Sequence, residues 1–119
     1  MKLIAIAAHR SEYLEPIHFS KGTLLNIGEK YQGSENWDNW DNWYFCTVDS
    51  GLEGWVPTQI IEWINKHQGH AIADYTAKEL NVDHGDLLVG EEQLNGWIWC
   101  SRLSDEQSGW VPLEVLSQI

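Results

Sequence analysis

The feature that most constrains this chain is an internal repeat: four short blocks occur in the first part of the sequence and return in the same order in the second. Within each pair of blocks, the apolar, glycine, tryptophan and proline positions correspond. The pairs are 5–9 with 71–75, 21–25 with 84–88, 43–46 with 97–100, and 54–57 with 109–112. Length differences fall only between the blocks, where loops are expected. A repeat of this kind predicts two copies of one small folded unit.

Each unit is predicted to be all-β. The apolar stretches are short and rich in Ile, Leu, Val and Trp, and clusters of Gly, Asp, Asn and Ser separate them. This pattern is typical of strands joined by turns, and no segment keeps the apolar spacing of a long amphipathic helix. The stretch 65–69 is polar and short. We therefore predict two tandem small all-β units of about five strands each, one at 1–65 and the other at 70–119.

Composition argues against several classes of partner. The chain carries 18 acidic and 7 basic residues, for a net charge of −11, and this charge repels phosphate backbones and anionic membrane surfaces. We therefore expect neither a nucleic acid nor a membrane partner. The first apolar run is shorter than a signal-peptide core and is interrupted by His9. Cys46 and Cys100 occupy equivalent strand positions, so we expect both to be reduced and buried in a cytoplasmic protein.

No arrangement of reactive residues predicts an enzyme. We find no Ser/His/Asp set, no Cys/His pair within the loops of one unit, and no glycine-rich phosphate loop. The five His residues lack the spacing of metal ligands. The sequence thus predicts a non-catalytic protein with no catalytic residues, cofactor or metal.

The four blocks resemble the Src-homology-3 (SH3) family. Its members open with Ala-Leu-Tyr-Asp-Tyr, continue through a Lys-Gly-Asp-x-Leu turn and a Trp-Trp strand, and close with Gly-x-x-Pro-x-x-Tyr-Val. The whole chain looks similar to bacterial variant SH3 proteins with two such domains in tandem. The resemblance implies SH3-like barrels, each with a groove whose aromatic slots bind a proline-rich peptide and whose loop carboxylates pair with a basic ligand residue.

The resemblance also implies a set of groove residues in each unit. In the first unit these are Trp43, Trp55 and Pro57, and in the second they are Tyr75, Glu79, Trp97, Trp110 and Pro112. Only the second unit keeps the loop acid, because Pro16 takes its place in the first. We therefore expect the second unit to bind the peptide.

Other groove positions depart from the family pattern. At several places where the opening and closing motifs of the family have tyrosine, this chain has another residue. These residues are Ala7, His9 and Ile60 in the first unit, and Ala73 and Val115 in the second. We therefore expect weak binding of simple proline-rich peptides, and a ligand that combines a basic residue with a bulky apolar one.

Several alternatives stay open at this point. Trp55 and Trp110 either cap the barrel cores or contact ligand, whereas Phe45 and Trp99 are predicted to be core residues. The Trp-Asp-Asn repeat at 36–43 is either a tolerated loop or a contact surface. The leading hypothesis is a protein- or peptide-binding module with an unidentified ligand. The alternative is a structural protein that self-associates or docks through barrel edges and the Trp-rich loop, so the oligomeric state stays open.

Overall fold

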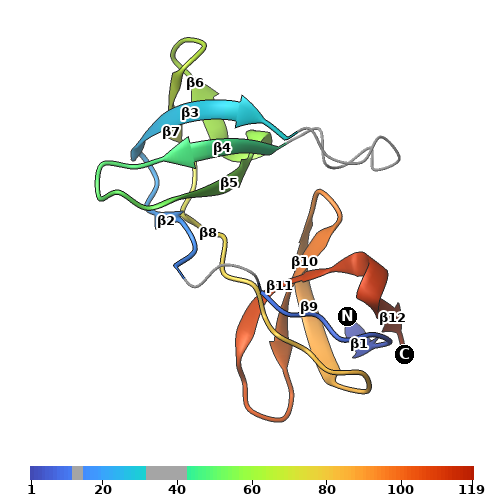
Figure 1. Ribbon diagram of the computed structural model, residues 1–119. Helices are drawn as coiled ribbons and strands as arrows, with labels where there is room; N and C mark the ends of the chain where they lie inside the picture. The colour runs from blue at the N-terminus through green and yellow to red at the C-terminus, as the bar shows by residue number, and fades with distance from the viewer. Residues whose placement is uncertain (12–14, 32–42) are drawn as a thin grey trace. The chain divides into compact units, whose positions relative to one another are not determined.

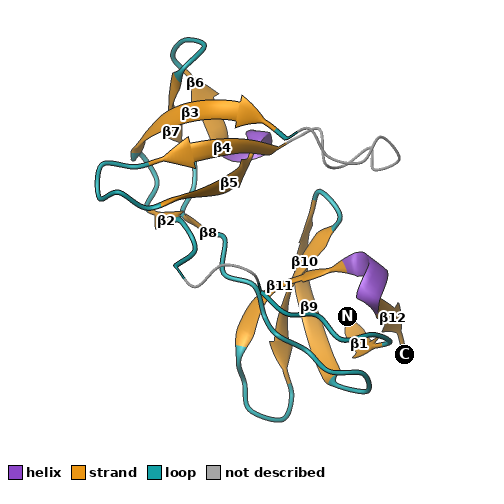
Figure 2. Ribbon diagram, viewed as in Figure 1, coloured by secondary structure: helices purple, strands orange, loops and turns teal. Residues whose placement is uncertain are grey.

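The computed structural model describes residues 1–11, 15–31 and 43–119 (Figure 1). Most of the Trp-Asp-Asn repeat, residues 36–42, lies outside the described residues. The described part consists of strands, turns and two 3₁₀ turns (Figure 2). The predicted all-β class is therefore confirmed. No helix in the described ranges has the length and apolar character needed to cross a membrane.

The chain divides into two compact units. One unit contains residues 15–77 and is called the continuous barrel below. The other unit contains residues 1–14 together with 78–119 and is called the two-segment barrel. Each unit contains one five-stranded sheet.

In the continuous barrel the strand order is β5-β4-β3-β7-β6, and all neighbours are antiparallel. These strands are β3 (Leu24–Lys30), β4 (Trp43–Thr47), β5 (Glu53–Pro57), β6 (Ile61–Trp63) and β7 (Gln68–Ala71). A short pair, β2 (His18–Phe19) with β8 (Tyr75–Thr76), belongs to the same unit. The 3₁₀ turn Thr58–Ile60 joins β5 to β6.

In the two-segment barrel the strand order is β11-β10-β9-β1-β12, again antiparallel throughout. These strands are β1 (Lys2–Ala5), β9 (Leu87–Leu94), β10 (Trp97–Arg102), β11 (Ser108–Pro112) and β12 (Leu116–Gln118). The 3₁₀ turn Leu113–Val115 joins β11 to β12.

The two repeats have exchanged their first strands. β1, from the first repeat, pairs with β9 and β12 of the second, and β7, from the second repeat, pairs with β3 and β6 of the first. In Figure 1 the blue β1 accordingly lies among orange and red strands. The units therefore differ from the predicted ranges 1–65 and 70–119. The polar stretch near 65 is the tight turn of the β6–β7 hairpin, in which the Gln68 carbonyl accepts from the amides of Ile64 and Asn65.

The register is the same in both sheets. Leu3 faces Leu88 on one side and Gln118 on the other. In the equivalent place, Gly69 faces Leu25 and Trp63. Each first strand therefore occupies the same slot, in the barrel of the other repeat.

A tight turn explains why the blocks 21–25 and 84–88 share a glycine. This turn precedes β3 in the first repeat and β9 in the second. Gly22 and Gly85 have φ values of 90° and 93°, in the left-handed region where glycine is not strained. The amides of Thr23 and Asp86 close these turns on the carbonyls three residues earlier. Both repeats thus use the same local chemistry to start the strand.

Each barrel has its own apolar core. The two-segment core is formed by Leu3, Ala5, Leu80, Val82, Leu88, Ile98, Cys100 and Val111. The continuous core is formed by Ile17, Leu25, Ile27, Cys46, Val48, Val56, Ile61 and Ala71. Cys46 and Cys100 are free thiols with no exposed surface, so the prediction that both are buried is confirmed.

The prediction that Phe45 and Trp99 are core residues is wrong. Both are partly exposed and lie outside the two cores. Side chains alternate between the two faces of a strand. Since Cys46 and Cys100 point into the cores, their preceding neighbours Phe45 and Trp99 must point outward.

Candidate functional site

Three tryptophans lie on the side of the two-segment sheet that faces away from its core: Trp97 and Trp99 are partly exposed, and Trp110 is 8% exposed. In β10, Trp97 and Trp99 alternate with the core residues Ile98 and Cys100. Trp99 pairs across the strands with Trp110, and their rings lie 5.4 Å apart at 78°, which is a favourable edge-to-face geometry. Because of the same alternation, Trp97 is brought to the neighbouring position on this face.

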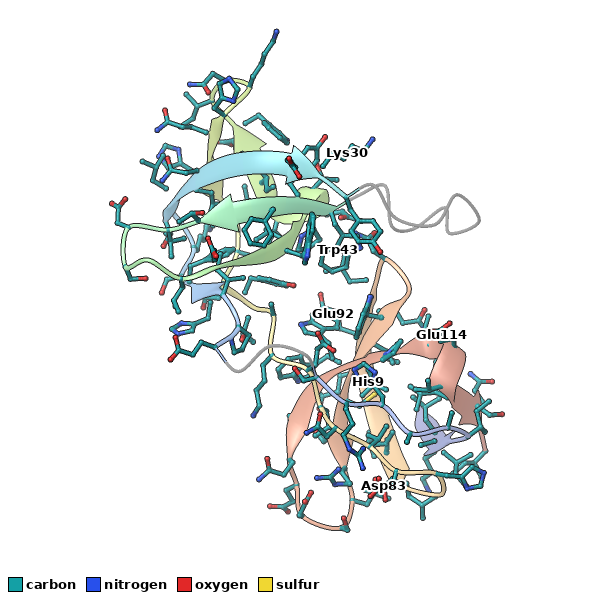
Figure 3. The ribbon with its side chains drawn as sticks, in the orientation of Figure 1. His9, Lys30, Trp43, Asp83, Glu92 and Glu114 are labelled. Carbon is teal, nitrogen blue, oxygen red and sulfur yellow. The ribbon has the colours of Figure 1, made fainter. Side chains whose placement is uncertain are left out.

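Trp97 lies beside a proline and a histidine. Its cross-strand partner in β11 is Pro112. The ring of His9 approaches it edge-on, with the centroids 5.7 Å apart at 76°. His9 is labelled in Figure 3, and a β-bridge to Val82 holds its backbone in place.

Glu79 completes this group of residues. Its neighbours along the chain pair with β11: the Leu80 amide donates to the Trp110 carbonyl at 3.0 Å, and the Trp110 amide donates to the Lys78 carbonyl at 2.9 Å. The imidazole Nε2 of His9 donates to Oε1 of Glu79 at 2.7 Å. The two side chains are only 17% and 14% exposed, respectively. The carboxylate is therefore held rigidly beside the aromatic face.

We call His9, Glu79, Trp97 and Pro112, with the neighbouring Trp99–Trp110 pair, the aromatic–acid site. Flat indole faces contact proline and apolar side chains well. A fixed carboxylate accepts charge-assisted hydrogen bonds from Arg or Lys. Because His9 uses only one of the Glu79 oxygens, the site has the chemistry to hold a short peptide with an apolar and a basic side chain.

Ion pairs tie together the loops at the other end of β10. Arg102 contacts Asp105 at 2.8 Å and Asp86 at 3.6 Å, and Arg10 pairs with Asp83. The Arg102 guanidinium, through its hydrogen bond, holds the pKa of Asp105 below its ordinary value. Arg10 lowers the pKa of Asp83 in the same way. These charges already have partners: Arg102 connects β10 to the loop before β9, and Arg10 connects the first segment of the barrel to the same loop.

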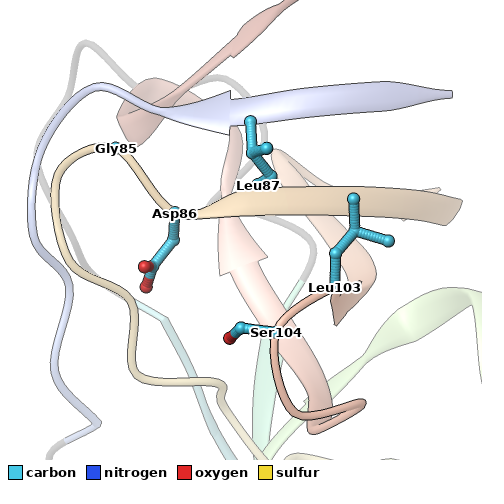
Figure 4. A pocket seen from close by; sticks show the side chains of 5 residues that line it. All are labelled: Gly85, Asp86, Leu87, Leu103 and Ser104. Carbon is cyan, nitrogen blue, oxygen red and sulfur yellow. The ribbon is translucent and has the colours of Figure 1, made fainter.

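A small hollow opens near these loops (Figure 4). It is lined by Gly85, Asp86, Leu87, Leu103 and Ser104. None of the predicted site residues lines it. Its two leucines are well exposed, at 45% and 56%.

The continuous barrel has an aromatic group of its own, centred on Trp55. Tyr31 and Phe45 each approach the Trp55 ring edge-on, with centroids 5.2 Å apart. The Tyr75 hydroxyl donates to the Trp55 carbonyl at 3.4 Å. Trp43 faces Pro57 across the strands and is 7% exposed. No acid lies at the position equivalent to Glu79, where this repeat has Pro16.

The structure separates the predicted site residues into two groups. The two-segment barrel holds Glu79, Trp97, Trp110 and Pro112, and the continuous barrel holds Tyr75, Trp43, Trp55 and Pro57. Tyr75 therefore does not lie with Glu79, because strand exchange carries it into the other barrel. The sequence-based set omitted His9 and Tyr31. The signal for His9 was its position in the opening block, which matches that of Tyr75.

The described residues show no metal-binding group and no reactive thiol. No set of three or more His, Cys, Asp or Glu residues in these ranges is arranged to hold a metal ion. Burial raises the pKa of the Cys46 thiol to about 12 and that of Cys100 to about 11. A thiol with so high a pKa is a poor nucleophile near neutral pH.

Comparison with known proteins identifies one family. The family model described as "Variant SH3 domain" matches residues 2–64, which is more than half of the chain. The match begins in β1 and ends after β6. A search of curated proteins found no match to this chain.

Proposed function

Because the chain belongs to the variant SH3 domain family, we propose that it is a non-catalytic module that binds a short segment of a partner protein at the aromatic–acid site. The observation that carries this proposal is the fixed position of Glu79, 2.7 Å from His9, whose ring in turn contacts Trp97 edge-on. A largely buried carboxylate needs hydrogen-bond partners, and within the described residues the bond from His9 uses only Oε1, so the second oxygen remains for a ligand. The site therefore has an acceptor for a cation beside a platform for an apolar group.

The ligand we propose has one basic and one bulky apolar side chain. The basic group would pair with Glu79, and the apolar group would stack on Trp97 against Pro112. The net charge of −11 also favours a basic ligand through long-range attraction. Ala7 and Ala73 stand where the family has tyrosines, so one slot for proline is incomplete in each repeat.

We further propose that both barrels are of the SH3 type, in tandem. The identical register of the two sheets supports this. The group around Trp55 lacks an acid equivalent to Glu79, so the proposed role of the continuous barrel is secondary. The two buried thiols form no disulfide, which agrees with a protein of the reducing cytoplasm.

A peptide titration tests this proposal. A panel of short peptides with Arg, an apolar anchor, both or neither is titrated by calorimetry against the full chain. We expect affinity for peptides with both groups. The Trp97→Ala variant should then bind at least about 30-fold more weakly, since an aromatic anchor contributes about 2 kcal/mol or more.

Two comparison variants make the result specific. Glu79→Gln should cost less than Trp97→Ala and should affect only the Arg-containing peptides. Trp63→Ala removes an exposed indole on β6 and should leave binding unchanged. If Trp43→Ala abolishes binding while Trp97→Ala does not, the site has been assigned to the wrong barrel.

A structural role through self-association is the second candidate function. Trp63 and Ile64 beside the β6–β7 turn are 40% and 53% exposed, and exposed apolar groups are common at interfaces. Light scattering of the full chain distinguishes the two roles. A stable oligomer that dissociates in the Trp63→Ala variant would favour the assembly role, and a monomer would favour peptide binding.

A further inference from the structure

The two barrels differ in side-chain size at one contact between the exchanged strand and its acceptor. In the two-segment barrel, the large side chain of Leu3 on the first strand, β1, contacts Gly90 on the neighbouring strand, β9. In the continuous barrel the sizes are reversed, since Gly69 on the first strand meets Ile27. The shared register makes these equivalent positions: Leu3 faces Leu88 two residues before Gly90, and Gly69 faces Leu25 two residues before Ile27.

Leu3 occupies the space that Gly90 leaves. A Cβ atom on residue 90 would lie 2.9 Å from Cδ1 of Leu3 and 2.5 Å from Cδ1 of Ile98. Such distances are too short for carbon atoms in contact. Leu3 is 3% exposed and belongs to the core of this barrel. A larger residue at position 90 would therefore displace the side chains of Leu3 and Ile98 from these positions.

The slot around Gly69 has no such room. A Cβ atom there would lie 2.7 Å from the Glu62 carbonyl oxygen, 2.8 Å from Cγ2 of Ile61 and 3.2 Å from Cδ1 of Ile27. One of these neighbours is backbone and cannot move aside as a side chain can. The continuous barrel therefore accepts a first strand that has glycine at this position and excludes one that has leucine.

Without exchange, both contacts would be mismatched. Each first strand would return to its own repeat, so the Leu3 side chain would meet Ile27 in the crowded slot, and Gly69 would lie beside Gly90 with no side chain between them. Overpacking would strain one core, and the other would contain a cavity. The remaining buried residue of each first strand is alanine in both cases, Ala5 and Ala71, so it does not distinguish the strands.

We propose that the size match of Leu3 with Gly90 and of Gly69 with Ile27 selects the exchanged arrangement, and that it interlocks the two repeats. Each barrel is then complete only with a strand from the other repeat. Neither repeat, including the segment 2–64 that matches the family, closes its own barrel. This inference does not depend on the proposed ligand or site.

Cleavage of the full chain tests the interlock. A protease site is inserted between Asn65 and Lys66, which are exposed in the β6–β7 turn, and the folded protein is cut there. Both barrels contain strands from both pieces in the exchanged arrangement. The pieces should therefore elute together from a sizing column under native conditions and separate only in denaturant.

A reversed variant tests whether size makes the selection. The double substitution Leu3→Gly with Gly69→Leu reverses the sizes of the two first-strand residues. The side-chain sizes then match in the unexchanged arrangement and no longer match in the exchanged one. After cleavage, its pieces should separate under native conditions. A second reversed variant, Ile27→Gly with Gly90→Ile, changes the acceptor strands instead and should behave in the same way.

An engineered disulfide gives a readout that does not depend on how the barrels adhere. Ile4 and Leu87 are direct neighbours on β1 and β9, so the pair Ile4→Cys with Leu87→Cys should link the two pieces in the native sequence and fail to link them in the reversed variants. Native pieces that separate and do not cross-link would overturn the interlock. Reversed variants that stay cross-linked, or that both fail to fold, would overturn size selection.

Discussion

His9 and Glu79 come from different repeats, yet Nε2 of one lies 2.7 Å from Oε1 of the other. Strand exchange produces this pair. The opening block of the first repeat supplies His9 to the barrel of the second, in the place where the order of the blocks would put Tyr75. The chemistry of the aromatic–acid site therefore depends on the exchange, because a basic imidazole rather than a phenol lies against the carboxylate.

The first prediction concerns the coupling between these two side chains. His9→Ala and Glu79→Ala should each lower the free energy of unfolding by about 1 kcal/mol, because each leaves a mostly buried partner without its hydrogen bond. The double variant should lose less than the sum, with a coupling of about 1 kcal/mol. Urea denaturation of the four proteins measures this.

The pair formed by Arg10 and Asp83 is the matched control. It also bridges the two segments of the barrel, but its side chains are 58% and 69% exposed. Exposed pairs contribute little to stability, because water and salt screen their attraction. A coupling as large there as at His9 and Glu79 would argue against a special role for the buried pair.

The second prediction concerns alkaline pH. Burial raises the pKa of Cys46 to about 12 and that of Cys100 to about 11, from 9.0. The folded state therefore favours the protonated thiol, whereas the unfolded chain loses this proton above pH 9. The stability from this difference is complete below pH 9 and is lost as the pH rises towards the folded pKa values.

Alanine variants separate this effect from other groups that titrate at high pH. Between pH 9 and 11, stability should fall by up to about 1.4 kcal/mol per pH unit for each thiol. The fall should be smaller in Cys46→Ala and in Cys100→Ala than in the native chain. Denaturation curves at several pH values measure it, and identical slopes in all three proteins would contradict the assignment.

Much of the fold was predictable from the sequence because strands and turns leave local signals. The repeat blocks predicted two all-β units, and the equivalent positions of Cys46 and Cys100 predicted burial. The error at Phe45 and Trp99 arose from taking aromatic size as a sign of the core. Side chains alternate between the two faces of a strand, so the residues next to the buried cysteines, Phe45 and Trp99, lie on the outer face.

The exchange itself was not predictable from the order of the blocks. Both first strands end in an alanine that opens the same Ala-Ile-Ala sequence, at 5–7 and 71–73, so this block fits either barrel. The distinguishing residues, Leu3 and Gly69, gain meaning only when the register shows what lies opposite them. The same limit applies to the site, since His9 and Tyr75 change places with their strands.

The third prediction concerns Gly109 in β11, which lies close against the backbone of Glu79 and Leu80. A Cβ atom there would lie 2.6 Å from the Leu80 amide nitrogen and 2.9 Å from the Glu79 carbonyl carbon. Gly109→Ala should therefore push this segment away from β11 and lower stability by about 1–3 kcal/mol. At the equivalent Gly54, the nearest atoms belong to the Ile17 side chain, the first at 2.9 Å, so Gly54→Ala should cost less. Thermal unfolding of both variants compares them, and an equal or larger loss for Gly54→Ala would contradict this account.

The last prediction uses the two thiols to report which core contains Leu3. Leu3 shares a core with Cys100 and not with Cys46. Leu3→Ala removes a buried side chain and should destabilise the two-segment barrel by about 2 kcal/mol or more. Local opening that exposes Cys100 should then become about 30-fold more frequent, and labelling of that thiol by a bulky reagent should accelerate to match. Labelling of Cys46 should change much less.

Leu25→Ala is the control, because Leu25 lies in the core that contains Cys46 and its substitution should produce the opposite pattern. If Leu3→Ala instead accelerates Cys46 more than Cys100, β1 closes the barrel of its own repeat and the exchanged fold is incorrect.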